Sequence, residues 1–301
     1  MGTLAERIRK ECPALWLEEQ VPMSGMTTLK LGGPADLLAQ PASETELAVL
    51  LRLAAEENCP VTVVGNGSNL LVLDGGIRGL VIRLGKRMAN LRQNGDELVA
   101  EGGATLGSIS QMAAAAGLTG LAFASGIPGT VGGAVMMNAG AYGGEMTQVV
   151  SLVEGISPDG TSFCYPGEEM RFGYRKSRLK AGKEIVTRVT MRLNKGDPEE
   201  ILREMKELNR RRAEKQPLTE PSAGSTFKRP EGNFAAALIE QCGLKGRSVG
   251  GAAVSEKHAG FLVNRGGTAN DFLQLMQLVT QVVAEKTGIR LEPEVRILGE
   301  Q

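Results

Sequence analysis

The sequence predicts an α+β fold in two domains. Its 301 residues are enough for roughly two domains at ~150 residues each. Helical hydrophobic periods and short apolar strands both occur along the chain, and no internal repeat is present. Glycine, at 40 residues, is about twice the average usage of ~7%. The excess lies in clusters, and those clusters are where function is expected.

Composition and charge exclude several classes of protein. Lys+Arg and Asp+Glu both number 34, so no net field attracts nucleic acid or an anionic membrane. No apolar run approaches the ~18 residues of a membrane-spanning helix, and residues 1–17 carry charges where a secretory signal needs an apolar stretch. We expect a cytoplasmic protein without membrane insertion or a nucleic-acid partner, and a monomer or weak oligomer.

The cysteines and the single histidine give no sign of a metal site. Cys12, Cys59, Cys164 and Cys242 are far apart in the sequence, with no C-x-x-C pair. Reduced thiols in a cytosolic protein are the simplest interpretation. His258 has no triad or metal set near it in the sequence, so a hydrogen-bonded structural role is favoured over catalysis.

Local signals place the first elements. Ser43 and Glu46 have the spacing of a capping box, so a helix is expected from there to about Asn58. A glycine-containing loop, Gly65–Asn69, follows the next strand. The short apolar runs that predict strands are 61–64, 70–73 and 79–84.

Later in the chain, Asp197 can cap a helix whose first position is Pro198, and this marks the start of a second domain. The cations at 210–212 then fall at the helix C-terminus, where the macrodipole favours them, so helix-end electrostatics is preferred to a phosphate site. Two further helices and three further strands are predicted, the second helix being stopped by Gly288: helices 108–116 and 270–285, strands 149–156, 185–193 and 294–298.

Two glycine-rich segments could bind phosphate. Gly65–Asn69 follows a strand, and its small residues let backbone N–H groups gather round an anion, although a plain turn explains it equally well. Leu70 stands where a dinucleotide fingerprint needs its third glycine and no helix follows, which disfavours a Rossmann site. The second segment, Ser125–Gly133, favours phosphate binding over a plain turn, because two glycine-rich loops could bind the two phosphates of FAD or a similar cofactor.

The sequences of these two segments and of four later ones resemble the motifs of a known family. VGNGSNLLV (64–72) and ASGIPGTVGG (124–133) are followed in order by FGYRKS (172–177), GSTFK (224–228), KHAGFLVN (257–264) and LEPEVR (291–296). Together they resemble the UDP-N-acetylenolpyruvoylglucosamine reductase (MurB) family, whose flavin domain is of the vanillyl-alcohol-oxidase or PCMH type. The likeness runs from about Thr27 to Gly299. The short interval between Arg175 and Ser225 resembles the compact subgroup of that family.

The resemblance implies a domain plan and an activity. The plan is an N-terminal helical segment over 1–28, a two-lobed FAD-binding (PCMH-type) domain over 29–196, and a C-terminal α+β substrate-binding domain over 197–301. The activity is a step of peptidoglycan precursor synthesis: NADPH reduces noncovalently bound FAD, and the flavin N5 then gives a hydride to C3 of UDP-N-acetylglucosamine enolpyruvate. The product would be UDP-N-acetylmuramate.

Three residues would carry the chemistry by resemblance. Charge developing at C2 needs fixed donors, and C2 needs a proton. Arg175 and Glu294 would stabilise the enolate-like intermediate, while Ser225 would donate the proton, with Lys228 as a contributor to its acidity. The FAD-binding residues would be Gly65, Asn66, Gly67, Ser68, Asn69, Leu70, Ser125, Gly126, Ile127, Pro128, Gly129, Thr130, Gly132 and Gly133. The substrate-binding residues would be Lys228, Arg229 and Arg296.

Other interpretations remain open on the residues alone. Arg175 could belong to a solvated basic loop, Ser225 to a turn, and Glu294 to a surface strand on which it shares a face with Glu292 and Arg296. Rival functions are a flavin oxidase or dehydrogenase acting on another small substrate, and a noncatalytic nucleotide-binding protein.

The chain departs from the family pattern at two positions. Met26 replaces a usual Asn, which weakens any role for that position. Arg229 replaces the Asn after Lys228, which puts substrate affinity in doubt or strengthens the grip on diphosphate.

Overall fold

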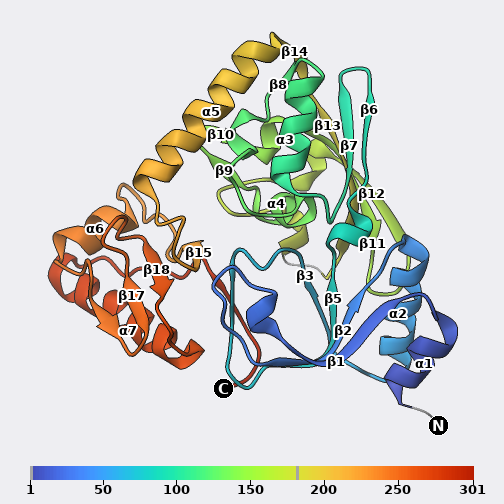
Figure 1. Cartoon of the computed structure of the whole chain (residues 1–301), viewed down its shortest axis with the longest axis horizontal. Coiled ribbons are helices and arrows are strands. Elements are labelled where there is room, and N and C mark those ends of the chain that lie inside the picture. Colours follow the sequence, from blue (N-terminus) through green and yellow to red (C-terminus); the bar gives the residue numbers. More distant parts are fainter. Residues whose placement is uncertain (1–2, 181–182) are drawn as a thin grey trace. The chain divides into compact units, whose positions relative to one another are not determined.

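The helices of the computed structural model, which describes residues 3–180 and 183–301, begin where the sequence supplies a cap. Ser43 accepts a hydrogen bond from Glu46 N at 3.2 Å, and Asp197 Oδ1 accepts one from Glu199 N at 2.7 Å. Gly288, at φ 74°, ends the last helix in the left-handed conformation. The α-helices are α1 Leu4–Glu11, α2 Glu44–Glu56, α3 Leu106–Ala115, α4 Val131–Met137, α5 Pro198–Lys215, α6 Ala235–Gln241 and α7 Ala269–Thr287 (Figure 1).

The predicted helices are confirmed, and two short ones, α4 and α6, were not foreseen. α2, α3, α5 and α7 match the predicted ranges to within a turn. The glycine-rich region 101–144 was expected to hold one helix but contains α4 as well, capped by Thr130. The opening segment contains a strand, β1 Trp16–Pro22, in addition to α1.

Within the described residues, the strands form three larger sheets and three pairs. The strands of the first sheet, in the order β1-β2-β5-β3, are β1, β2 Pro34–Gln40, β5 Ile77–Arg83 and β3 Val61–Val64. The second, in the order β12-β11-β13-β7-β6, contains β12 Ser162–Pro166, β11 Val150–Ile156, β13 Ile185–Arg192, β7 Glu97–Glu101 and β6 Leu91–Asn94. The third, in the order β15-β18-β17-β16, contains β15 Ser222–Ser225, β18 Phe261–Asn264, β17 Ala252–Val254 and β16 Ser248–Val249. The pairs are β4 Leu70–Val72 with β19 Arg296–Leu298, β9 Gly140–Ala141 with β10 Gly144–Glu145, and β8 Leu118–Thr119 with β14 Asn194–Lys195.

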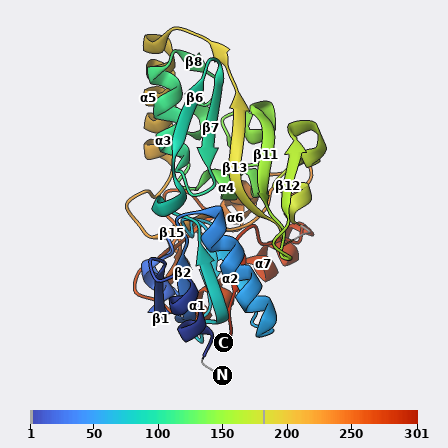
Figure 2. The same ribbon diagram turned by 90° about the vertical axis from the view of Figure 1, so that its right-hand side faces the viewer.

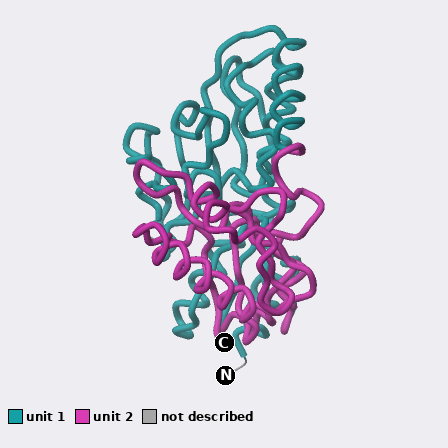
Figure 3. Tube along the Cα trace, turned by 90° about the vertical axis from the view of Figure 1, so that its left-hand side faces the viewer, with its two compact units in different colours: residues 1–18, 37–66, 79–212 teal, residues 19–36, 67–78, 213–301 magenta. Residues whose placement is uncertain are grey.

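The described chain divides into two compact units that are interleaved in sequence (Figure 3). Unit 1 comprises the described parts of 1–18, 37–66 and 79–212. In it, α3 and α4 pack on the five-stranded sheet, where Ile109 and Val135 share a core with Val153 and Val189 (Figure 2). A second core joins α1 and α2 to β5, with Leu50 and Leu80 fully buried.

Unit 2 comprises residues 19–36, 67–78 and 213–301. Its core lies between α7 and the sheet of β15 to β18, with Leu275 and Val279 of α7 packed with Val254 and Leu262 (Figure 1). β4 joins this unit through its parallel pairing with β19, in the register Leu70↔Arg296. The domain ranges 1–28, 29–196 and 197–301 stay predictions. No helix in the described part of the chain is both long enough and apolar enough to span a membrane.

Candidate functional site

The two glycine-rich segments meet in unit 1. Gly65 directly follows β3, and a Cβ added there would collide with Thr130 Oγ1 and lie 3.2 Å from Thr130 Cγ2. Asn66 Nδ2 donates to Pro128 O at 3.3 Å. Only a glycine at position 65 leaves room for this approach. The structure thus brings together two loops that are more than sixty residues apart in the sequence.

The second loop is held by its own backbone bonds. Ile127 N donates to Ala124 O at 3.0 Å, and Leu106 N donates to Gly129 O at 3.1 Å. Thr130 is buried at 2% exposure, and its Oγ1 accepts from Gly133 N at 3.4 Å to cap α4. Gly132 N donates to Gly102 O at 2.9 Å. These bonds tie the loop to α3 and to the segment before α3, and a preformed cofactor site requires a backbone fixed in this way.

α5 packs against the same loop through Arg212, a residue that the sequence analysis did not assign to the cofactor site. A Cβ on Gly126 would collide with Asn209 Oδ1 and lie 3.1 Å from Arg212 Cδ. Arg212 Nε is buried without a hydrogen-bond partner, and burial lowers the pKa of Arg212. Its position could have been found, because Arg212 continues the helical stripe of Ile201 and Met205, both of which are buried.

The other two arginines of this run are surface residues. The Nε atoms of Arg210 and Arg211 bind Glu207 at 2.8 and 2.7 Å. These two hydrogen bonds lower the pKa of Glu207 to about 2. Exposed ion pairs near a helix end agree with the electrostatic interpretation for these two residues. Arg212 differs from them in packing against Gly126 of the glycine loop, and for this residue the interpretation stays a prediction.

The rest of the first glycine loop lies in unit 2. A Cβ on Gly67 would collide with Met26 O, and Gly67 has φ 65°. Position 26 therefore contacts the loop through its backbone, so the Met in place of Asn leaves this contact available. Asn69 Nδ2 donates to Glu294 O at 3.2 Å, and Arg296 N donates to Asn69 O at 2.9 Å. The loop end, Glu294 and Arg296 are thus joined directly.

Two of the three predicted catalytic residues come together in unit 2. Ser225 ends β15 and is exposed, and the next residue, Thr226, accepts a bond from Glu294 N at 2.8 Å through its carbonyl. Phe227 forms a bridge with Pro293. The segment carrying Ser225 and the segment carrying Glu294 therefore run side by side. β19 begins only at Arg296, so the prediction that Glu292, Glu294 and Arg296 share one face of a strand is wrong.

Lys228 is engaged by a neighbouring carboxylate. Its Nζ lies 2.7 Å from Glu292 Oε2, and this hydrogen bond lowers the pKa of Glu292. The pair is accessible, with side-chain exposures of 39% and 70%. Much of the charge that could make Ser225 more acidic is therefore balanced within the protein.

Arg175, the third predicted catalytic residue, lies in unit 1 on a fixed turn. Its φ of 52° is unusual for an arginine, and Lys180 Nζ donates to its carbonyl at 3.1 Å. Its guanidinium lies 5.2 Å from the ring centroid of Tyr174. Ser177 Oγ anchors the turn by donating to Met136 O at 2.8 Å. Arg175 is thus half-buried in an ordered turn, and its catalytic role stays a prediction.

His258 makes contacts of the kind expected for a structural residue, and its role stays a prediction. Its Nδ1 accepts from Gly260 N at 3.2 Å, and its ring makes an edge contact with Phe261 at 5.0 Å. Burial lowers the pKa of His258. Within residues 3–180 and 183–301, no group of three or more His, Cys, Asp and Glu side chains is placed to hold a metal ion.

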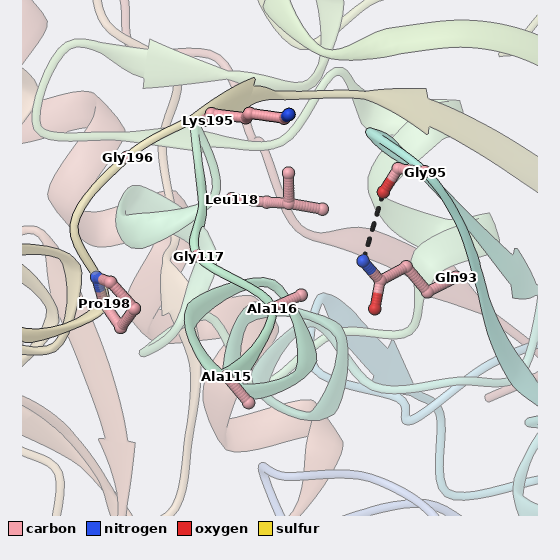
Figure 4. A pocket seen from close by; sticks show the side chains of 9 residues that line it. All are labelled: Gln93, Gly95, Ala115, Ala116, Gly117, Leu118, Lys195, Gly196 and Pro198. Atoms are coloured by element: carbon pink, nitrogen blue, oxygen red, sulfur yellow. Dashed lines mark hydrogen bonds between the residues drawn. The ribbon is translucent and has the colours of Figure 1, made fainter.

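A separate pocket of about 400 Å³ lies elsewhere in unit 1 (Figure 4). Gln93 Nε2 donates to Gly95 O at 3.1 Å on one side of it, and Lys195 is its one charged residue. None of the predicted cofactor, catalytic or substrate residues lines this pocket. The lining residues are Gln93, Gly95, Ala115, Ala116, Gly117, Leu118, Lys195, Gly196 and Pro198.

The residues in unit 1 fit the flavin cofactor that the motifs suggest. Gly65 and Gly126, which have no side chain, allow the backbone and α5 to approach closely, and the half-buried Arg212 supplies a cation whose buried Nε is an unused donor. Buried donors without partners are rare in native proteins and suit a ligand rich in phosphate and carbonyl oxygens. The candidate cofactor site in unit 1 is therefore centred on Gly65 and Asn66, the 125–133 loop and the Arg212 face of α5.

Comparisons with known proteins agree with this arrangement. A family model described as an FAD binding domain matches residues 35–163, and one described as the UDP-N-acetylenolpyruvoylglucosamine reductase C-terminal domain matches residues 216–298. Reductases of that name from Caldanaerobacter subterraneus and Pediococcus pentosaceus are 50% and 49% identical, covering 95% and 96% of this chain and 94% and 96% of theirs. The crystal structure of the Thermus caldophilus reductase of this type matches with a TM-score of 0.83 at 41% identity, over 95% of this chain and 100% of that one.

Proposed function

Because the chain belongs to the UDP-N-acetylenolpyruvoylglucosamine reductase family, we propose that it uses NADPH, through bound FAD, to reduce UDP-N-acetylglucosamine enolpyruvate to UDP-N-acetylmuramate. The observation that carries the proposal is the convergence of motifs far apart in the sequence. Gly65 meets the Thr130 loop in unit 1, and the segments of Ser225 and Glu294 run together in unit 2. A reductase of this kind needs a cofactor cradle, an acid and a carboxylate clamp.

The cofactor would be held by the two glycine loops. FAD, when bound, supplies the hydride that reaches C3 of the enolpyruvyl group. The backbone N–H groups that take no part in the bonds described above, and that could donate to a phosphate, are those of Gly65, Asn66, Gly126 and Gly129. Arg212, which is half-buried, would place its guanidinium, with its buried and unused Nε donor, against the cofactor. The absence of a hydrogen-bond partner for that atom within the protein supports this role.

The acid–base chemistry would be shared by three residues. Ser225, exposed at the end of β15, would donate a proton to C2 as charge develops there. Arg175 has a planar fork that matches the substrate carboxylate, which a lysine would match less well. Glu294 is half-buried and anchored through its own N–H, so its carboxyl group would be held in place to help stabilise the charge that develops on the substrate. The residues offered for the rest of the substrate are Lys228, Arg229 and Arg296.

An anaerobic absorbance experiment tests the two half-reactions separately. NADPH added to the purified holoprotein should bleach the flavin band near its usual visible maximum. UDP-N-acetylglucosamine enolpyruvate added next should restore that band fully. Bleaching without recovery would contradict the proposed acceptor, and steady oxygen consumption in air without the acceptor would favour a flavin oxidase instead.

A further inference from the structure

The loop that follows Ser225 carries a cation stacked on an exposed aromatic ring. Arg229 Cζ lies 4.6 Å from the ring centroid of Phe234. Phe234 is 60% exposed, the highest value among the exposed large hydrophobic residues. The function proposed above assigns Arg229 to the substrate but leaves Phe234 without a role.

Position 234 departs from two local rules at once. Phe234 is the N-cap of α6 and makes no side-chain capping bond, although Ser, Thr, Asp and Asn are strongly preferred there. Its ring is also left in water where burial would be favourable. Residues that break local preferences without a structural gain tend to lie at functional sites.

The loop between the ring and Ser225 is fixed at both ends. Lys228 N donates to Glu292 O at 2.9 Å on one side, and Asn233 N donates to Pro230 O at 3.2 Å on the other. Leu238 N then binds the carbonyl of Phe234 at 3.1 Å. The ring and the guanidinium are therefore presented by an ordered loop, which lowers the entropic cost of binding a ligand.

From these contacts we propose that Phe234 and Arg229 form the receptor for the uridine diphosphate end of the acceptor. The ring stacks on the uracil, and it also holds the guanidinium of Arg229 toward the diphosphate. Aromatic rings stack on nucleic-acid bases, and arginine matches phosphate oxygens bidentately. This inference rests on the proposed function, because that function supplies the uridine diphosphate.

The position along the chain favours the acceptor over the reductant as the source of the diphosphate. Arg229 is four residues from Ser225, so the two side chains are anchored within about 13 Å of each other even for extended backbone. In the acceptor, the diphosphate and the enolpyruvyl group are attached to the same sugar ring. One short loop can therefore serve both ends of the sugar.

The test compares holoenzyme variants by binding and by half-reaction. Phe234→Ala and Phe234→Leu should each raise the dissociation constant of UDP, measured by calorimetry on the oxidised holoenzyme, by about tenfold, the scale of one base–aromatic stack. Phe234→Tyr should keep it within about twofold, because the π-face remains. KM for the acceptor should rise in parallel, whereas the rate of flavin bleaching by NADPH should not follow.

Two controls separate stacking from general effects. Leu218→Ala removes another exposed apolar side chain of unit 2, 54% exposed, and should leave UDP binding unchanged. Arg229→Ala combined with Phe234→Ala should weaken UDP binding by less than the product of the single effects, since the ring positions the guanidinium.

Different outcomes would overturn the assignment of Phe234 and the proposed function. A change in UDP affinity below twofold for Phe234→Ala would overturn the inference, as would an effect confined to the NADPH step. If the wild-type holoenzyme binds no UDP and its bleached flavin is not restored by the acceptor, the proposed function itself fails.

Discussion

Replacing Gly65 with alanine tests the contact on which the cofactor site depends. The added Cβ would lie 3.2 Å from Thr130 Cγ2 and still closer to Thr130 Oγ1. Thr130 cannot move freely, because it is buried at 2% exposure and its Oγ1 caps α4 by accepting from Gly133 N. Rotating the Thr130 side chain away from the new Cβ would remove the helix cap, which costs about 1 kcal/mol of stability, and would strain the packing around it, which costs about 1–3 kcal/mol.

The expected cost of Gly65→Ala is therefore about 2–4 kcal/mol in the free energy of unfolding of unit 1. It is measured by urea unfolding of the apoprotein, and the dissociation constant of FAD is measured by fluorescence quenching. Gly107→Ala is the matched control. A Cβ there would come no closer than 3.5 Å to Ser125 O, inside α3, so alanine should stabilise the helix by about 0.5–1 kcal/mol.

Thr130→Ala supplies the internal check. It removes the two closest atoms and leaves only Thr130 Cβ, which would lie 3.4 Å from the new Cβ in ordinary contact, so Gly65→Ala should cost at least about 1 kcal/mol less in that background than in the wild type. Equal costs in both backgrounds, or a Gly65→Ala variant that unfolds and binds FAD like the wild type, would refute the reasoning.

Three further predictions address the site and its surroundings. Ser225→Ala should leave the NADPH half-reaction intact and slow flavin reoxidation by the acceptor about 10²–10⁴-fold in single-turnover absorbance. Reoxidation at the wild-type rate would remove Ser225 as the proton donor. Arg212→Met should weaken FAD binding about tenfold in fluorescence titration, as expected for the loss of one charge-assisted hydrogen bond, while Arg211→Met should not. Because the folded pKa of Glu207 is about 2, against an ordinary value of 4.5, its ion pairs stabilise the protein above pH 4.5 and are lost as pH falls toward 2. Thermal unfolding should thus show Glu207→Gln as less stable than the wild type at pH 7, with the difference shrinking toward pH 2.

Helices that carry their own start and stop signals could be predicted from the sequence. Ser43 caps the start of α2, Asp197 caps α5 before Pro198, and Gly288 ends α7. Each of these residue types is one that locally favours the start or end of a helix. α4 escaped prediction because two of its seven residues are glycines, which disfavour helices by propensity. It is held instead by tertiary bonds, such as Val131 N to Ala104 O at 2.8 Å.

The short strands of unit 2 escaped for a related reason. β16 and β17 contain only two and three residues, too few for a period of two to be read. Their pairing partners supply the order that the local sequence lacks. The same holds for Ser225 and Glu294, which only the family resemblance singled out and only long-range pairing brings together.

The loop Gly65–Asn69 shows how much function can lie beyond a local interpretation. The sequence of this loop is compatible with an ordinary turn. The contacts described for its first two residues are with Thr130 and Pro128, in another segment. A glycine is needed at position 65 because Thr130 lies so close to it. A glycine is needed at position 67 because Met26 O lies close to it, and the φ of 65° at Gly67 is a second reason. The two glycines thus meet different requirements, a close approach in unit 1 and a left-handed backbone in unit 2. A substitution at Gly65 should be relieved by shrinking Thr130, whereas at Gly67 no smaller neighbour can help, because the obstacle is backbone.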